Sequence, residues 1–336
     1  MQSSGNLSAV LMKERLNSNF AKKGIFTGLF SGCTWGMNSV LLGIALGLVP
    51  VLDEKAYVFA LPLAAAFFSD FIAGLWLLAY NGVAGRVQEI WRTLKTFPGL
   101  MVCVAALLGG PIAMGGYLMG ISMAGPAYAL PITALYPVVG AILSRIFLKQ
   151  VIIPRVWLGI ALSIAGAIVI SYVPPEGTVS SVFYLGLIFA SLAAFGWGSE
   201  AVLSVFGMNM VDPKVAINIR QLTSGLVMFV FVLPFVGGWG VASQVVTLPN
   251  ALGVFALAAL ASAASYLAWY KANNMIGVAK GVVLNGTYVM WGVVFSVLFM
   301  SLTLTQNLVI GSVLIMIGAA LVAVDPKELF KKGGKS

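Results

Sequence analysis

Ten long apolar segments, joined by short polar connections, occupy most of this 336-residue chain. A transmembrane helix needs about 20 mainly apolar residues, and every segment has that length. Only 9% of the residues are charged, against roughly 25% in an average soluble domain. The pattern therefore excludes a soluble globular protein and a disordered chain. The segments are 25–49, 57–80, 99–123, 126–148, 153–173, 182–206, 214–236, 250–275, 279–301 and 304–324.

These segments are expected to be helices, because a backbone exposed to lipid must satisfy its own hydrogen bonds. The short alternating runs that mark the strands of a membrane barrel are absent from the sequence. We therefore predict an all-α polytopic membrane protein with ten transmembrane helices. Prolines interrupt the third and fourth segments, at Pro111 and at Pro126, Pro131 and Pro137. They indicate either static kinks or points of gating near a site.

The basic residues predict the orientation in the membrane. With the N-terminus placed inside, all 19 lysines and arginines except Lys55 and Arg220 fall at inner connections, tails or helix ends. Cytoplasmic loops of membrane proteins carry such an excess. We therefore expect a multi-pass protein of the bacterial plasma (inner) membrane with both termini cytoplasmic. The net charge of +9 does not indicate nucleic-acid binding, because no basic patch is interleaved with exposed aromatic residues.

The two halves of the sequence resemble one another at a nearly constant separation, which indicates an internal duplication. The aligned pairs are Trp35 with Trp197, Asn38 with Glu200, Tyr117 with Trp269, Gly125 with Gly277, Tyr136 with Tyr288, Gly140 with Gly292, Gly159 with Gly311 and Gly166 with Gly318. Each half holds five predicted helices, an odd number, so the halves have opposite orientations. Inverted repeats of this kind are typical of alternating-access carriers with a substrate site near the midplane.

This duplication predicts the domain organisation. A cytoplasmic tail, 1–24, precedes the first five-helix repeat, 25–173. The second repeat is 182–324, and a second cytoplasmic tail is 325–336.

Two stretches carry a family resemblance. PITALYPVVGAILSRIFL (131–148) and WLGIALSIAGAIVI (157–170), with their counterparts 283–300 and 309–322, resemble the EamA-type repeats of the drug/metabolite transporter superfamily. The resemblance implies a ten-helix carrier. It leaves the substrate open, because the superfamily carries amino acids, nucleotide sugars, drugs and vitamins.

Four shorter motifs point to one branch of that superfamily. SGCTWG (31–36), GWGSEAV (196–202), VDPK (211–214) and IRQLTSGLV (219–227) resemble the bacterial choline permeases. This resemblance implies uptake of choline or a related quaternary ammonium compound, with aromatic side chains around the trimethylammonium group.

Three ionisable residues, Asp70, Glu200 and Arg220, lie within predicted spans. Charges at this depth are costly and usually functional. Glu200 is interpreted either as a substrate counter-ion or proton carrier, or as the ion-pair partner of Arg220 at a similar depth. Asp70 lies deeper and has no obvious basic partner. It is interpreted as a proton-coupling group or as a neutral carboxyl hydrogen-bonded to a neighbouring helix.

Aromatic residues within the spans are the candidate substrate contacts. A quaternary ammonium group cannot donate a hydrogen bond, so ring faces are its natural partners. Recurrence of aromatic pairs in the two halves favours a central site, and ordinary helix packing is the alternative. The candidates are Trp35, Tyr117, Tyr136, Trp197, Trp269, Tyr288 and Trp291, with Asn285 as a polar contact.

The sequence thus predicts a secondary transporter that imports choline or a related quaternary ammonium compound by alternating access. The membrane potential, a proton gradient or both would drive it, because no nucleotide-binding loop is present. The alternative is an exporter of amino acids or other small hydrophobic metabolites. We expect no catalytic residues, no cofactor and no metal site, since the chain has no His. The expected partners are a small cationic substrate and the lipid bilayer, with no nucleic acid, and the protein is expected to be a monomer or weak homodimer.

Overall fold

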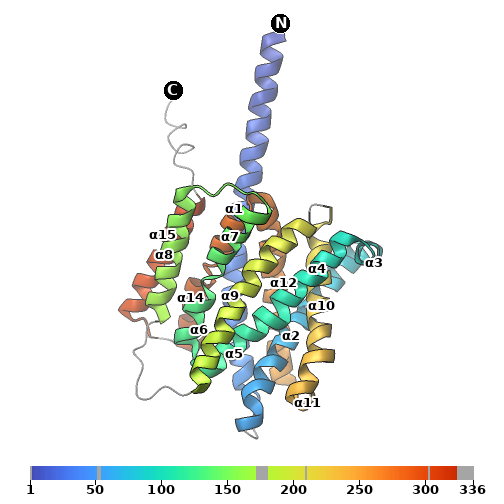
Figure 1. Cartoon of the computed structure of the whole chain (residues 1–336), viewed down its shortest axis with the longest axis vertical. Coiled ribbons are helices and arrows are strands. Elements are labelled where there is room, and N and C mark those ends of the chain that lie inside the picture. Colours follow the sequence, from blue (N-terminus) through green and yellow to red (C-terminus); the bar gives the residue numbers. More distant parts are fainter. Residues whose placement is uncertain (1, 51–53, 172–180, 209, 302, 324–336) are drawn as a thin grey trace.

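The computed structural model describes residues 2–50, 54–171, 181–208, 210–301 and 303–323 (Figure 1). Within these ranges every regular element is a helix, and the long helices lie side by side as a bundle. Helix α1 begins and helix α15 ends on the same side of this bundle (Figure 1). The predicted all-helical class is therefore confirmed.

Nine helical segments of the described ranges are long and apolar enough to cross a membrane. They are α1 (Gln2–Gly47), α2 (Glu54–Val83), α4–η1–α5 (Phe97–Leu107, Leu108–Met114, Gly115–Ala124), α8 (Pro154–Ser171), α9 (Ser181–Gly207), α10–η2–η3 (Pro213–Val227, Met228–Val232, Leu233–Val236), α12 (Pro249–Ile276), α13–α14 (Val278–Asn285, Tyr288–Met300) and α15 (Gln306–Ala323). Two short helices, α3 (Val87–Leu94) and α11 (Gly238–Val246), lie between them. Nine of the ten predicted segments thus coincide with these helices.

The remaining predicted segment, 126–148, forms two shorter helices. They are α6 (Pro126–Thr133) and α7 (Tyr136–Phe147), separated at Ala134 and Leu135. Pro137 has no backbone N–H to donate to the Thr133 carbonyl, so the hydrogen-bond ladder of α6 does not continue into α7. The predicted interruption is confirmed, and no single helix of spanning length forms here.

A matching break separates α13 from α14 at Gly286 and Thr287. These residues align in sequence with Ala134 and Leu135. The two broken segments also begin alike: Gly125 precedes α6 with φ 82° and ψ 156°, and Gly277 precedes α13 with φ 84° and ψ 155°. Only glycine adopts such a conformation readily, so the aligned glycines serve the same purpose.

The crossing of α8 and α15 shows a reciprocal relationship. A Cβ atom added to Gly159 would lie 2.7 Å from the carbonyl oxygen of Gly318, and one added to Gly311 would lie 2.5 Å from that of Gly166. Gly159 aligns with Gly311 and Gly166 with Gly318. The contact of Gly159 with Gly318 is therefore repeated, with the two halves exchanged, by that of Gly311 with Gly166, as in a contact between elements related by a two-fold axis.

Helix α1 packs closely against the C-terminal half along only part of its length. A Cβ added to Gly24, Gly28 or Gly36 would come within 3 Å of Ile276, Leu284 or Trp291, respectively. Beyond this contact, a Cβ on Gly43 would meet nothing within 4 Å. Small residues at every fourth position let helices approach in a membrane, so α1 lies close to α12, α13 and α14 along its middle part and apart from α14 near its end.

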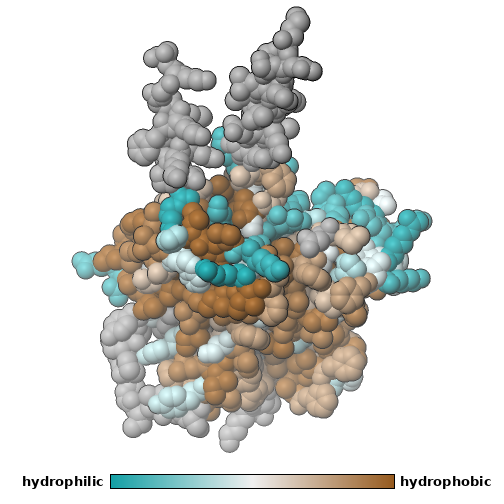
Figure 2. All heavy atoms as spheres, turned by 45° about the horizontal axis from the view of Figure 1, so that its top comes forward, coloured by the Kyte–Doolittle hydropathy of each residue, from teal (hydrophilic) through white to brown (hydrophobic). Residues whose placement is uncertain are grey.

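The outer surface is largely apolar, as expected for a protein surrounded by lipid. Large hydrophobic side chains such as Phe26 (69% exposed), Phe147 (70%) and Leu298 (66%) face outward. Hydrophobic residues cover the middle of the face seen in Figure 2, and hydrophilic residues gather towards the side on which α1 begins. A soluble protein would rarely expose so much contiguous apolar surface.

Candidate functional site

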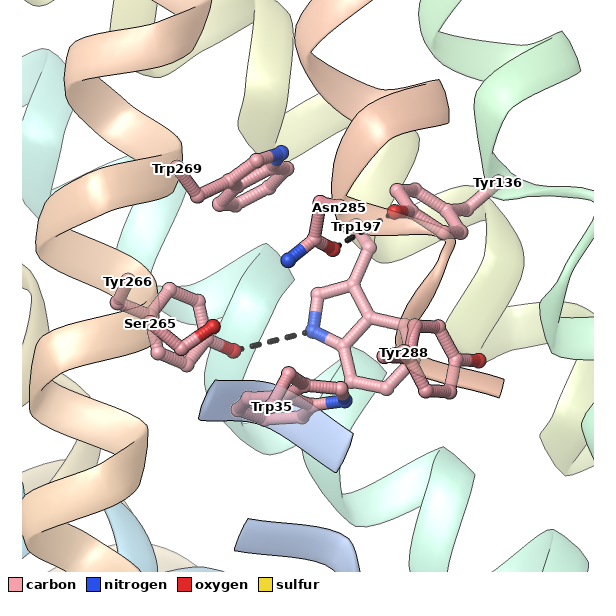
Figure 3. A pocket seen from close by; sticks show the side chains of 8 residues that line it. All are labelled: Trp35, Tyr136, Trp197, Ser265, Tyr266, Trp269, Asn285 and Tyr288. Atoms are coloured by element: carbon pink, nitrogen blue, oxygen red, sulfur yellow. Dashed lines mark hydrogen bonds between the residues drawn. The ribbon is translucent and has the colours of Figure 1, made fainter. Parts of the chain in front are cut away.

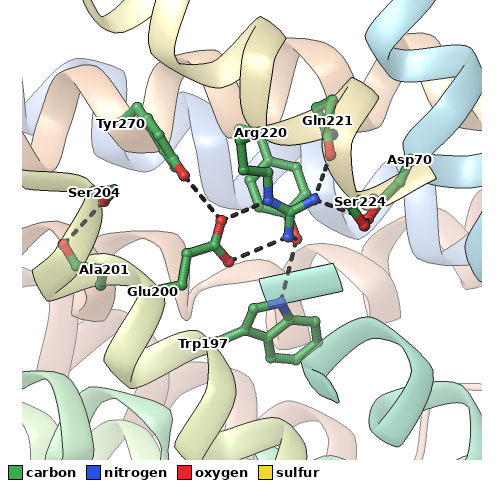
Figure 4. Close-up of polar contacts among 10 residues, drawn as sticks. Asp70, Trp197, Glu200, Ala201, Ser204, Arg220, Gln221, Ser224 and Tyr270 are labelled. Carbon is green, nitrogen blue, oxygen red and sulfur yellow. Dashed lines mark hydrogen bonds and ion pairs between the residues drawn. The ribbon is translucent and has the colours of Figure 1, made fainter. Parts of the chain in front are cut away.

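A buried ion cluster joins α2, α9 and α10 in the interior of the bundle (Figure 4). Arg220 donates from Nε to Glu200 Oε1 at 2.6 Å and from Nη2 to Glu200 Oε2 at 3.2 Å. From Nη1 it donates to Asp70 Oδ2 at 2.9 Å. The two carboxylates and the guanidinium are almost completely inaccessible to solvent. Paired, hydrogen-bonded geometry of this kind is what allows charges to be buried.

The expectation that Asp70 lacks a basic partner is therefore wrong. Position along a helix gives the depth of a Cα atom, but an arginine side chain is long enough to reach a carboxylate at a different depth. Helices α2 and α10 also pack closely, since a Cβ on Gly74 would lie 2.7 Å from the Leu222 side chain. The ion pair between Glu200 and Arg220, one of the two alternatives drawn from sequence, is present.

Hydroxyl and amide groups complete the cluster. Tyr270 donates to Glu200 Oε1 at 3.0 Å, and Ser224 donates to Asp70 Oδ2. Arg220 also donates to Gln221 and, from Nη2, to the Tyr266 hydroxyl oxygen at 3.0 Å. The guanidinium carbon lies 4.3 Å from the centre of the Tyr266 ring, in a cation–π contact.

The π-helical turn η1 provides the space that the ion cluster occupies. A side chain on Gly109 would overlap Glu200 Oε2, and one on Gly110 would overlap the Ser224 hydroxyl. Pro111 lies within this turn and cannot donate a ladder hydrogen bond. π-Helical turns are frequent at functional sites. The sequence indicates only that these glycines allow close helix packing; the structure shows that what packs there is a charge cluster.

An aromatic pocket of about 20 Å³ lies next to the ion cluster (Figure 3). Its walls come from α1, α7, α9, α12, α13 and α14. The ring of Trp35 lies 5.2 Å from Tyr266 and 6.0 Å from Trp197, both edge-on, and Tyr136 lies 6.2 Å from Trp197. The lining residues are Trp35, Tyr136, Trp197, Ser265, Tyr266, Trp269, Asn285 and Tyr288.

Polar contacts hold one side of this pocket in place. The Tyr136 hydroxyl lies 2.7 Å from the Val282 carbonyl oxygen and 2.7 Å from Asn285 Oδ1. Asn285 donates from Nδ2 to Ser31 Oγ at 2.7 Å, and Ser31 also bonds with Ser265. Satisfied polar networks of this kind make a buried site rigid.

Trp197 connects the pocket with the ion cluster. Its Nε1 donates to the Tyr266 hydroxyl oxygen at 3.2 Å, and that same oxygen accepts the hydrogen bond from Arg220. Trp197 also precedes Glu200 by three residues in α9, so both lie on nearly one helix face. A ligand in the pocket would thus be one hydrogen bond away from the buried charges.

Six of the residues selected from sequence line this one pocket: Trp35, Tyr136, Trp197, Trp269, Asn285 and Tyr288. Tyr117 packs against Trp197 at 5.3 Å but lines a neighbouring cavity. Trp291 does not line the pocket; it stacks on Phe295 at 6.0 Å and packs against Gly36.

Two tyrosines of the site were missed by the sequence analysis, Tyr266 and Tyr270. The search relied on aromatic pairs that recur in both halves, and these tyrosines align with Met114 and Leu118. Their spacing could have identified them, because Tyr266, Trp269 and Tyr270 share one face of α12.

A second cavity of about 320 Å³, here called the vestibule, adjoins the aromatic pocket and shares Tyr288 with it. It lies between the last turns of α1 and α8, the middle of α5, the whole length of α14 and the N-terminal part of the broken 126–148 segment. All of these parts lie towards the side of the bundle opposite the beginning of α1. Gly43 and Gly292 line it, and a Cβ on either would meet nothing within 4 Å. The vestibule thus extends from Tyr288 towards that side.

Comparison with known proteins identifies the family. The sequence model of the EamA-like transporter family matches twice, at residues 22–172 and 184–324. Protein LicB of Haemophilus influenzae is 25% identical over 277 residues, which cover 81% of this chain and 87% of LicB. A solved crystal structure, 18% identical, has the same fold, with a TM-score of 0.67 over 93% of this chain and 99% of the other. The apolar exterior, the spanning helices and these matches lead to one conclusion: the chain is a multi-pass membrane protein and belongs to the EamA-like transporter family.

Proposed function

We propose that this transporter imports choline or a related quaternary ammonium compound by alternating access, with the aromatic pocket as its binding site. The observation that carries the proposal is the position of Trp197, which is both a wall of the pocket and hydrogen-bonded to the tyrosine that contacts Arg220. The resemblance of residues 31–36, 196–202, 211–214 and 219–227 to choline permeases is consistent with it.

The chemistry of the pocket suits a cation that cannot donate hydrogen bonds. Six aromatic rings surround the space, and each ring that faces such a cation contributes about 0.5–2 kcal/mol. Three rings would then supply several kcal/mol of binding free energy. The present volume of about 20 Å³ holds little more than one water-sized sphere, so the rings have to separate when a trimethylammonium group enters.

The ion cluster favours a positive ligand nearby. Two carboxylates face one guanidinium, which leaves an excess of one negative charge when both carboxylates are ionised. Uncompensated charge inside a membrane protein is costly. A cation in the aromatic pocket would offset it, and so would a proton on Asp70 or Glu200. Proton coupling through this pair is therefore part of the proposal, alongside direct use of the membrane potential.

The proposed architecture has ten transmembrane helices in two inverted five-helix repeats, 25–173 and 182–324, in the bacterial inner membrane with both termini cytoplasmic. The two matches to the family model and the equivalent conformations of Gly125 and Gly277 support it. In this orientation the vestibule opens outward. The aligned glycines differ accordingly: a Cβ on Gly140 would contact Val278 at 3.4 Å, whereas one on Gly292 would meet nothing.

Uptake would follow from this outward-open arrangement. The substrate enters through the vestibule, binds among the rings and is released inside when the outer halves of α1 and α14 close together. A potential of 100 mV, negative inside, supplies about 2.3 kcal/mol per unit charge. That energy suffices to concentrate a cation roughly fiftyfold.

The test is uptake of radiolabelled choline into liposomes that contain the purified protein, under an imposed inside-negative potential. Trp197→Ala is compared with Trp239→Ala, a tryptophan in α11 that is half exposed and far from the pocket lining. We expect saturable, potential-dependent uptake by the wild type and by Trp239→Ala, and its loss in Trp197→Ala. Absence of uptake by the wild type would contradict the proposal and favour export of amino acids or other small hydrophobic metabolites.

A further inference from the structure

The vestibule is larger than the approach to a small polar cation requires. Its volume of about 320 Å³ falls within the range of dedicated ligand pockets, about 300–1,000 Å³. Tyr288 lines both this space and the aromatic pocket, so a ligand with a flexible chain that displaces this one side chain would reach from one space into the other.

The lining of the vestibule is apolar and carries no charge. Apart from the hydroxyls of Ser39, Ser296 and the tyrosines Tyr117 and Tyr288, only aliphatic, methionine and glycine residues face it. Among the residues that the structure describes, no arginine, lysine, aspartate or glutamate contributes to this lining. Apart from these hydroxyls the described lining offers no partner to a charged group, whereas a hydrocarbon chain placed there would be removed from water.

We propose that the vestibule binds the alkyl chain of amphipathic quaternary ammonium compounds whose cationic head lies in the aromatic pocket. This inference rests on the proposed function, because it takes the quaternary head from that proposal and adds the chemistry of the tail. The occupant follows from the two neighbouring cavities: aromatic rings next to the buried ion cluster for the head, and an apolar space for the chain.

The arrangement has two consequences. Affinity rises with chain length, by about fourfold for each methylene group that is buried, until the vestibule is filled. A filled vestibule also prevents the outer parts of α1 and α14 from approaching one another, so the long-chain compounds bind without being transported. They are competitive inhibitors of the uptake of the short-chain substrate.

The glycines of the vestibule allow a direct test. Leucine at position 43 or 292 would project into the open space, since a Cβ there meets nothing within 4 Å. Gly253→Leu is the matched control, because Gly253 also has open space around its Cβ but lies on α12, away from the vestibule.

The experiment measures displacement of radiolabelled choline from the protein in nanodiscs by alkyltrimethylammonium compounds from methyl to octyl. We expect the affinity of the wild type and of Gly253→Leu to increase about fourfold per methylene. The dependence on chain length should flatten in both Gly43→Leu and Gly292→Leu. Partition of the compounds into lipid is the same for all these proteins, so it cannot produce such a difference.

The outcomes separate this inference from the proposed function. If choline and tetramethylammonium bind but affinity does not depend on chain length, the vestibule proposal is overturned and the proposed function stands. The same holds if the dependence is unchanged in both leucine variants. If neither choline nor tetramethylammonium binds, both the vestibule proposal and the proposed function are overturned. Displacement of a radiolabelled octyl compound by octanol would then show an apolar site that does not recognise the quaternary head.

Discussion

Trp197 and Tyr266 share a hydrogen bond of 3.2 Å between the aromatic pocket and the ion cluster. Trp197 belongs to α9 and Tyr266 to α12, and both line the aromatic pocket. The Tyr266 oxygen also accepts a hydrogen bond from Arg220. A ligand that displaces the Trp197 or Tyr266 ring would therefore also disturb the hydrogen bond from Arg220 to Tyr266. The proposed transport cycle requires such a connection between the pocket and the ion cluster.

Removal of the Tyr266 hydroxyl should weaken ligand binding while the ring stays in place. Tyr266→Phe leaves the Trp197 N–H without its acceptor, and a hydrogen bond is worth about 0.5–1.5 kcal/mol. We expect choline affinity to fall about two- to tenfold, measured by equilibrium binding to the purified protein. Tyr270→Phe, which loses only its bond to Glu200, should have a smaller effect. An equal loss of choline affinity in the two variants would contradict a specific role for the hydrogen bonds of the Tyr266 hydroxyl.

Loss of one carboxylate of the ion cluster should reduce the stability of the protein far less than loss of the guanidinium of Arg220. In Glu200→Gln, Arg220 keeps its pair with Asp70. In Arg220→Met, two buried carboxylates lose their partner, and breaking a buried pair in this way costs about 3–5 kcal/mol. Thermal unfolding in detergent should thus show a large loss of stability for Arg220→Met and a small one for Glu200→Gln. The reverse order would contradict the assigned geometry.

Even one methyl group in the π-helical turn should disturb the cluster. The Cβ of Gly109→Ala would overlap Glu200 Oε2, which forces the carboxylate away from Arg220. We expect a lower melting temperature and impaired choline uptake. Gly253→Ala, where the added methyl meets open space, is the control and should match the wild type. Normal uptake by Gly109→Ala would mean that the ion pair can shift without consequence.

The proposed orientation can be tested with single cysteines. Cys33 and Cys103 are replaced by alanine, and a cysteine is placed at Gln88 in α3 or at Thr303 before α15, both exposed positions. A membrane-impermeant maleimide added to intact cells should label Thr303→Cys and leave Gln88→Cys unlabelled until the cells are opened. Labelling of Gln88→Cys in intact cells would show that the orientation in the membrane is the opposite of the proposed one.

Sequence pattern predicted the helical architecture well because the bilayer imposes a strong constraint on it. A spanning segment must be long, apolar and helical, and nine of ten predicted segments are such helices. The fourth differed because Pro137 ends the helical ladder locally, and a hydropathy pattern does not register that loss.

Prediction of the site was less complete because side-chain reach and helix neighbours are three-dimensional properties. Aligned aromatic residues found Trp35, Trp197 and Tyr288, whereas Trp291, selected only for its position within a span, packs elsewhere. Tyr266 has no aromatic counterpart and was not selected. The pairing of Asp70 with Arg220 depends on α2 packing against α10, and no local motif reports that contact.

The central claim is that the aromatic pocket recognises positive charge rather than shape alone. Choline and 3,3-dimethyl-1-butanol, its neutral carbon counterpart, have nearly the same shape, so their binding to the purified protein compares charge directly. Two ring contacts at about 0.5–2 kcal/mol each correspond to roughly a fivefold or greater preference for choline. Such a preference, reduced in Trp197→Ala, is the expected result. Equal affinity for the two compounds would contradict the account.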